Sequence, residues 1–78
     1  MAYENLQELL KEELVFVAES NTEYFIRVRP TEPFDVSMWR VDKETGLAFY
    51  IEFTTFAIEH LDQDAREIDV DEFKGRFA

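Results

Sequence analysis

The sequence predicts one small α+β domain, in which an N-terminal amphipathic helix packs on a three- or four-stranded antiparallel sheet and one or two short acidic helices follow. Three patterns predict this fold class. Leucines recur at helical spacing near the N-terminus, apolar and aromatic residues alternate between residues 23 and 54, and acidic residues cluster from residue 59 onward. With 78 residues, the chain is near the lower size at which a core without disulfides or metals is stable, so we expect residues 1–78 to form a single domain.

The segment from Tyr3 to about Glu13 is expected to form the N-terminal helix. Its leucines lie on one side of a helix, whereas charged residues such as Glu8 and Lys11 lie elsewhere. An apolar stripe of this kind more often packs on a sheet than faces a partner. The stripe consists of Leu6, Leu9, Leu10 and Leu14.

The residues from Leu14 to Val17 are β-branched or aromatic for the most part, which favours a strand. The leucine spacing can also continue through them, which would give one long helix, and the sequence leaves both interpretations open. A turn is expected at residues 19–22, where Ser, Asn and Thr follow one another.

Residues 23–29 alternate in the manner of a second strand. Pro30 and Pro33 end it, because proline has no amide donor for the ladder. We expect each strand to lie beside the next, as in a meander. One face of this strand holds Tyr24, Ile26 and Val28, and the other holds Phe25, Arg27 and Arg29.

The stretch from Ser37 to Thr54 predicts a β-hairpin whose turn contains Gly46, because glycine takes positive φ without steric cost. A four-residue loop pairs Val41 with Ala48, whereas a loop with a glycine bulge pairs Val41 with Phe49. We favour the second register because it collects apolar residues on one face, and a slip of one residue exchanges the faces. Its apolar face holds Trp39, Val41, Leu47, Phe49, Ile51 and Phe53, and its other face holds Arg40, Asp42, Ala48, Tyr50, Glu52 and Thr54.

Two kinds of side chain on these strands have alternative interpretations. Trp39 is expected in the core, but in the other register it joins Tyr50 in an outer aromatic patch suited to a partner. Arg27, Arg29 and Arg40 would share a solvent-side face. We favour cross-strand pairing with Glu23, Glu52 or Tyr50 over an anion-binding patch, because no glycine-rich loop or helix start accompanies the arginines.

The acidic C-terminal segment is expected to contain the short helices. Thr54 or Thr55 can cap a first helix through Ala57, Ile58 and Leu61, unless the preceding strand continues to Phe56. Asp69 and Glu72 have the spacing of a capping box, so a final helix is predicted through Val70, Phe73 and Phe77. Lys74 and Arg76 fall in its last turn, where positive charge suits the helix dipole.

The charge balance bears most directly on function. Eighteen acidic and eight basic residues give a net charge of −10, which would repel a nucleic acid and attract a basic protein surface. The simpler interpretation is that this charge only keeps an aromatic-rich protein soluble. Carboxylates on successive helix turns or alternate strand residues lie roughly 5 to 7 Å apart, comparable to phosphates along one strand. Small acidic inhibitors encoded by phages and mobile elements use such mimicry as a class, and this chain is similar to them in size and charge only.

Other chemistry finds little support in the sequence. A calcium loop that starts at Asp62 places Glu67 where glycine is required and Phe73 where the bidentate glutamate belongs. No cysteine is present, so neither disulfides nor thiolate metal sites are expected. His60 is the only histidine and has no evident nucleophile or metal ligand beside it, and we therefore expect neither an enzyme nor a cofactor.

We therefore expect a cytoplasmic, non-enzymatic protein that binds a basic protein surface, with no direct contact to nucleic acid or membrane. In the more specific form of this hypothesis, it inhibits a nucleic-acid-binding partner by mimicry of phosphates. The alternative is a structural or assembly module that forms a homodimer or joins a larger complex through a sheet edge and an aromatic face. The expected partner-binding residues are Glu59, Asp62, Asp64, Glu67, Asp69, Asp71 and Glu72.

Overall fold

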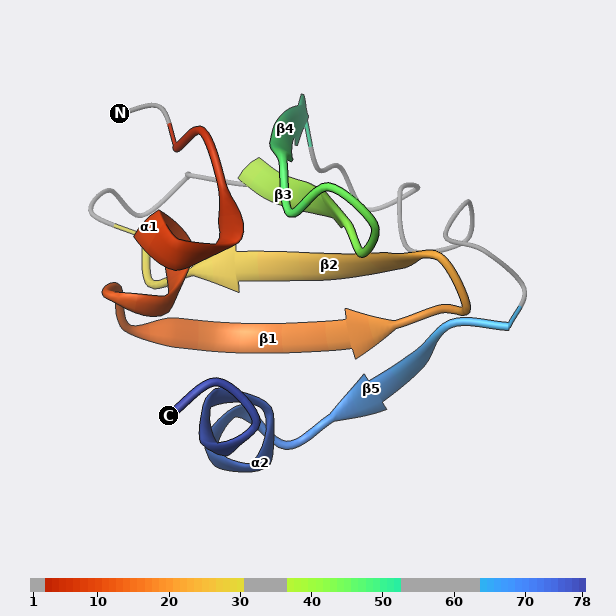
Figure 1. The fold of residues 1–78 in the computed structure, drawn as a ribbon. Coiled ribbons are helices and arrows are strands. Elements are labelled where there is room, and N and C mark those ends of the chain that lie inside the picture. The colour runs from red at the N-terminus through yellow and green to blue at the C-terminus, as the bar shows by residue number, and fades with distance from the viewer. Residues whose placement is uncertain (1–2, 31–36, 53–63) are drawn as a thin grey trace.

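The computed structural model describes residues 3–30, 37–52 and 64–78, with only the backbone described at Ser37 and Glu52. These residues form a five-stranded antiparallel sheet with two short helices (Figure 1). The strand order is β4-β3-β2-β1-β5, so the first four strands form the predicted meander and a fifth is added at the far edge. The elements are α1 (Leu6–Leu10), β1 (Leu14–Glu19), β2 (Glu23–Val28), β3 (Ser37–Asp42), β4 (Ala48–Glu52), β5 (Arg66–Ile68) and α2 (Val70–Gly75).

Helix α1 is shorter than the sequence predicts. It begins after Asn5, whose side-chain oxygen accepts a hydrogen bond from the Glu8 amide, and it ends at Leu10 rather than near Glu13. The reason lies in the sheet: the carbonyl of Glu13 accepts a hydrogen bond from the Arg29 amide at 2.8 Å, so the chain has already left the helix. The amphipathic character is confirmed over this single short helix, because Leu6 and Leu9 are buried.

Strand β1 resolves the ambiguity at Leu14 to Val17 in favour of a strand. It pairs with β2 in antiparallel orientation, with an irregularity between Leu14 and Phe16. The predicted alternation of β2 is confirmed: Ile26 packs with the helices on one face of the sheet, and Phe25 is buried on the other.

The predicted register of the hairpin is wrong. Val41 lies opposite Ala48 and Trp39 opposite Tyr50, which is the register of a four-residue loop. The Asp42 side chain holds this loop, because its oxygen accepts a hydrogen bond from the Glu44 amide at 2.7 Å. Gly46 has a φ of 76°, and its amide donates to the Asp42 carbonyl at 2.8 Å.

The physical reason for this error is that both faces of the sheet are buried. We favoured the bulged register because it left one polar face. However, Met38 and Phe25 are buried on the face opposite the helices, where they form a second cluster with Ala18. Segregation of apolar residues to one face is therefore no guide to register here, and Phe49 and Ile51 lie on the same face as Met38.

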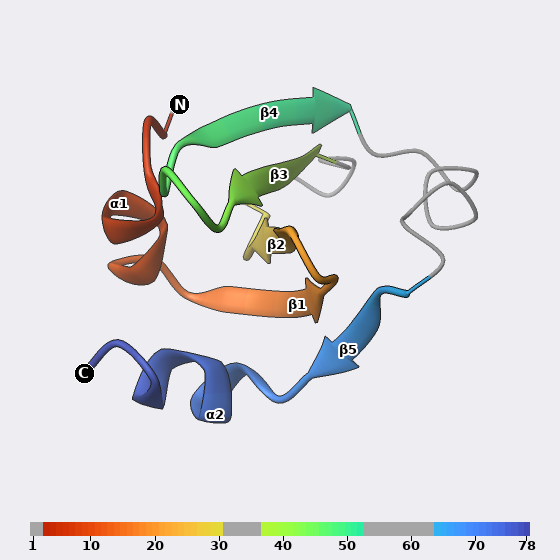
Figure 2. The same cartoon turned by 45° about the vertical axis from the view of Figure 1, so that its right-hand side comes forward.

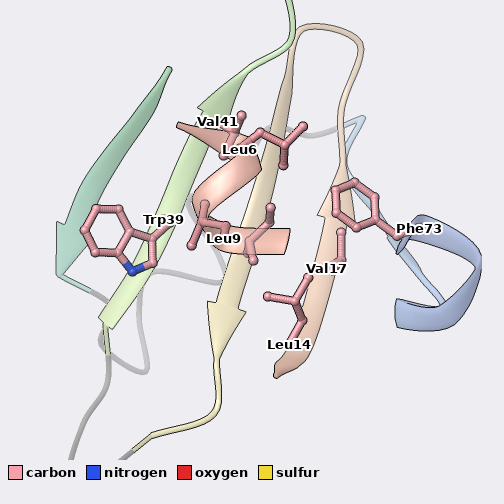
Figure 3. Packing of buried hydrophobic residues seen from close by; sticks show 8 residues of the cluster. Leu6, Leu9, Leu14, Val17, Trp39, Val41 and Phe73 are labelled. Atoms are coloured by element: carbon pink, nitrogen blue, oxygen red, sulfur yellow. The ribbon is translucent and has the colours of Figure 1, made fainter. Parts of the chain in front are cut away.

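The first face carries the larger core, in which α1 and α2 both pack on the sheet. Figure 3 shows Leu6 and Leu9 of α1 above the central strands, with Phe73 of α2 beside Val17. The Phe73 ring also meets the Tyr24 ring edge to face, with 5.0 Å between centroids. The buried members of this core are Leu6, Leu9, Leu14, Val17, Ile26, Trp39, Val41 and Phe73.

The C-terminal segment differs from its prediction in one element. Strand β5 was not expected, because its three residues interrupt an acidic segment, yet it pairs with β1 and places Ile68 opposite Val17. Helix α2 begins as predicted, since the Asp69 side chain accepts a hydrogen bond from the Glu72 amide at 3.1 Å, but it ends at Gly75, so Arg76 caps it and Phe77 lies beyond it. The predicted helix through Ala57, Ile58 and Leu61 lies outside the described residues. Neither of the two described helices has the length and apolar character needed to cross a membrane.

Candidate functional site

Five of the predicted partner-binding residues come together along β5 and the start of α2. All five side chains are exposed, and we call this group the acidic edge. It runs along the outer strand of the sheet, at the end opposite β4 (Figure 2). The other two predicted residues, Glu59 and Asp62, lie outside the described residues. The acidic edge consists of Asp64, Glu67, Asp69, Asp71 and Glu72.

Strand alternation separates acid from base within this segment. Arg66 lies opposite Glu19, and Glu67 lies opposite Ala18. Because neighbouring residues of a strand point to opposite faces, Arg66 lies on the helix-bearing face and Glu67 on the other. The sequence alone did not reveal this separation, since β5 was not predicted.

The bases of the C-terminal segment are directed toward β1 and the residues before it. Arg76 lies 3.2 Å and Arg66 3.6 Å from the Glu19 carboxylate. The ammonium of Lys74 donates a hydrogen bond of 2.7 Å to the Glu12 carbonyl. These three side chains therefore bind α2 and β5 to the sheet instead of neutralising most of the acids beside them.

The acidic edge retains most of its charge as a result. The side chain of Glu72 lies 3.7 Å from Arg76, an exposed pair of little energetic weight. Asp64 accepts a hydrogen bond from the Asn21 amide at 3.0 Å, and Asp69 caps α2, so the described partner of each is a backbone amide and not a basic side chain. Within residues 3–30, 37–52 and 64–78, no basic side chain forms an ion pair with Glu67 or Asp71.

Glu19 is the ion-pair centre that sequence reasoning missed. Its side chain is 12% exposed and meets Lys43 at 3.0 Å in addition to Arg66 and Arg76. The hydrogen bond from Lys43 lowers the pKa of Glu19, burial opposes this effect, and the hydrogen bond from Arg76 adds to it. The three partners are remote in sequence, and Glu19 was assigned only to a turn, so no local pattern identified it.

The other charged and aromatic residues singled out above have structural roles. Arg40 lies 3.6 Å from Glu23, which confirms one predicted cross-strand pair, whereas Arg29 pairs with Glu13. Trp39 is buried in the core as predicted, and its ring meets the Tyr50 ring edge to face at 5.3 Å. Tyr50 thus shares the face of Trp39, but this face is the one on which the helices pack.

Among residues 3–30, 37–52 and 64–78, no group of acidic side chains is arranged to hold a metal ion. The arrangement along β5 and α2 is instead an open surface of fixed negative charge, which suits contact with a cationic macromolecule. Comparisons of the chain with models of protein families, with curated protein sequences and with solved structures gave no match.

Proposed function

We propose that the protein is a small non-enzymatic binding protein of the cytoplasm, whose acidic edge occupies the cationic, nucleic-acid-binding surface of a partner protein. One observation carries the proposal: in the C-terminal segment, basic side chains contact Glu19 of β1, whereas most acidic side chains face solvent at the outer edge of the sheet. Arg66 and Arg76 meet Glu19, while Glu67 and Asp71 have no basic partner among the described residues. Charge that served solubility alone would not require this sorting.

The spacing of the acids supports mimicry of a phosphate backbone. Glu67 and Asp69 are two residues apart in extended chain, which separates their Cα atoms by about 7 Å. Asp71 and Glu72 continue the series on the first turn of α2. A groove that binds nucleic acid presents Lys and Arg at similar intervals, so several of its basic side chains can meet the acidic edge together.

The affinity of such a contact comes from many weak pairs. A single exposed ion pair contributes about 0 to 1 kcal/mol, so one or two carboxylates would not hold a partner. The net charge of −10 also accelerates the encounter with a basic surface, an effect that falls steeply as salt is added. Strong dependence on salt is therefore the expected property of the complex.

The role of Ser20 supports a function without catalysis. Ser20 is buried, and its hydroxyl donates to the Glu23 carbonyl and accepts from the Glu23 amide at 3.1 Å. The hydroxyl therefore closes the β1–β2 turn. A serine nucleophile would instead need a base within hydrogen-bond distance and access to substrate.

The proposal is tested by affinity purification from the native host with three baits. The first is the wild-type chain, and the second carries Glu67→Lys and Asp71→Lys, which leave the described ion pairs and caps intact. The control carries Glu4→Lys and Glu44→Lys, two exposed acids away from the acidic edge. Each replacement changes the charge by +2, so both variants have a net charge of −6 instead of −10.

The wild type and the control are expected to retain the same basic nucleic-acid-binding protein at about 50 mM salt and to release most of it at about 200 mM. The bait with the altered acidic edge is expected to retain little at either concentration. Equal retention by that bait and the control would refute the proposal, as would a captured partner that salt does not release.

A further inference from the structure

The edge of the sheet opposite β5 is apolar. Leu47, Phe49 and Tyr50 are 48%, 45% and 58% exposed, and only two other large hydrophobic residues of the described chain, Val15 and Phe77, are comparably exposed. All three belong to β4 or the residue before it, and β4 is the last strand of the sheet (Figure 2). We call Leu47, Phe49 and Tyr50 the apolar edge.

The backbone of β4 is covered only at its start. The Ala48 amide donates to the Glu4 carbonyl at 2.9 Å, and the Leu6 amide donates to the Gly46 carbonyl at 2.9 Å. These bonds lie on the side of β4 away from β3. Hydrogen-bonding direction alternates along a strand, so the backbone groups of Tyr50 point to that same side, and no described residue bonds to them.

Beyond the start that the N-terminal segment covers, β4 has little of the usual protection against pairing with another strand. Exposed edge strands commonly carry lysine, proline or a bulge, or are very short. Strand β4 contains neither lysine nor proline and pairs regularly with β3 through five residues. The contrast with β5 is clear, because β5 has three residues and two of them, Arg66 and Glu67, are exposed and charged.

We propose that the apolar edge is a dimer interface, in which β4 pairs in antiparallel orientation with β4 of a second copy of this chain. A two-fold axis then brings the same patch of both copies together, and the two five-stranded sheets join into one. The two acidic edges lie at the far ends of the joined sheet, where each remains free to bind a partner.

Charge argues against a cationic partner as the occupant of this edge. A basic macromolecule is attracted to the unneutralised acids at the opposite end of the sheet. Beside the apolar edge, by contrast, the guanidinium of Arg40 lies 5.6 Å from the centroid of the Phe49 ring. The exposed acids Glu4 and Glu44 flank the start of β4, where the N-terminal segment already covers the strand.

The available area fits a weak, reversible dimer. A fully buried aromatic side chain covers about 150 to 250 Å², so half-exposed Phe49 and Tyr50 contribute roughly 100 Å² each. With Leu47 and the strand backbone, the two copies together bury on the order of 800 Å², below the roughly 1,200 to 2,000 Å² of a stable specific interface. The dimer is therefore populated at high protein concentration.

Salt distinguishes this interface from the acidic edge. Both copies carry a charge of −10 and repel one another at low salt. The molecule measures 30 × 27 × 21 Å, so the centres of two paired copies lie well beyond the Debye length of about 8 Å at 0.15 M salt but within that of about 30 Å at 0.01 M. Added salt is thus expected to strengthen the dimer, whereas it weakens binding to a cationic partner.

Sedimentation equilibrium of the wild-type chain between about 10 µM and about 1 mM tests the proposal, with measurements at about 0.01 M and about 0.15 M salt. We expect a monomer–dimer equilibrium that is stronger at the higher salt. Tyr50→Lys should raise the dissociation constant at least about tenfold, because it places a charge in the paired edge. Val15→Lys is the matched control, with the same new charge on another exposed hydrophobic residue of a strand, and should leave the equilibrium near that of the wild type.

A second measurement needs no substitution. Amide hydrogen exchange of the wild type is expected to slow at Tyr50 and Glu52 as the protein concentration rises, and to remain constant at Glu67. A wild-type chain that is monomeric at about 1 mM in both salts overturns the proposal. So does a dimer that Tyr50→Lys leaves intact, or one whose concentration-dependent protection lies outside β4. None of these results would refute the proposed function of the acidic edge, because binding there is measured with a different partner and has the opposite salt dependence.

Discussion

The ammonium of Lys43 lies 3.0 Å from the carboxylate of Glu19 and joins the β3–β4 turn to the end of β1. Arg66 of β5 and Arg76 of α2 meet the same carboxylate. One acidic side chain thus connects three parts of the chain that are remote in sequence. The same contacts withdraw two bases from the acidic edge, so that the stability of the C-terminal segment and the charge of its surface depend on Glu19.

Replacement of Glu19 by glutamine is expected to lower the free energy of unfolding by about 1 to 2 kcal/mol. The substitution keeps the size of the side chain but leaves three cations without their shared carboxylate. Glu13→Gln is the control, since its pair with Arg29 is exposed on both sides and should contribute less than about 1 kcal/mol. Urea unfolding measures both. Equal losses in the two variants would mean that Glu19 is an ordinary surface acid.

The pH dependence of stability follows from the lowered pKa of Glu19, caused chiefly by the hydrogen bond from Lys43. Because the pKa is lower in the folded state, the carboxylate stabilises the fold above the reference value of 4.5, and this contribution is lost as pH falls through the folded value. The difference in unfolding free energy between the wild type and Glu19→Gln should therefore be constant near neutral pH and shrink below about pH 4.5. Urea unfolding over a pH series checks this, and a difference that persists unchanged in acid would contradict it.

Phe73→Ala is expected to detach α2 from the sheet. Phe73 is fully buried in the core and meets the Tyr24 ring edge to face, so its loss should lower the free energy of unfolding by about 3 to 5 kcal/mol, a large part of the stability of so small a domain. Phe77→Ala is the comparison, because Phe77 is partly exposed and should cost clearly less. Thermal and urea unfolding followed by circular dichroism distinguish the two, and a mild effect of Phe73→Ala would show that α2 is not part of the core.

The two glycines should respond to alanine in opposite directions. Gly46 has a φ of 76°, and nothing lies within 4 Å of an added Cβ, so Gly46→Ala is expected to cost about 1 kcal/mol through backbone strain alone. Gly75 ends α2 without positive φ and also has open space around an added Cβ, so Gly75→Ala should be neutral or stabilise by up to about 1 kcal/mol. Paired urea unfolding curves test the signs. A neutral Gly46→Ala would mean that the loop has another conformation in solution.

Sequence patterns correctly predicted the helices and strands that are determined by neighbouring residues in the sequence. Residues 23–28 alternate as a strand because each side chain faces either the helices or the second cluster, and Asp69 caps α2 through a bond to an amide three residues away. The type of β1 was left open by its sequence, because leucine spacing and β-branched residues overlap there. Its strand conformation depends on pairing with β2 and β5, which no local pattern contains.

The errors arose where distant contacts decide the structure. The hairpin register was wrong because the opposite face of the sheet is also buried, as Met38 and Phe25 show. Strand β5 was missed because three residues with two charges have little strand character, and only the edge of β1 holds them in place. The acids of the candidate site were visible in the sequence, but the separation of Arg66 from Glu67 became evident only once β5 was placed.

The amide spectrum of the isotopically labelled chain, recorded with and without the partner captured from the host, tests the central claim most directly. The acidic edge is expected to form the contact, so the amide signals from Asp64 to Glu72 should shift or broaden at low salt and return as salt is added. Signals of Leu47 to Glu52 should not change at concentrations below dimer formation. Changes confined to the residues around Phe49 and Tyr50, with residues 64–72 unaffected and no response to salt, would contradict the account.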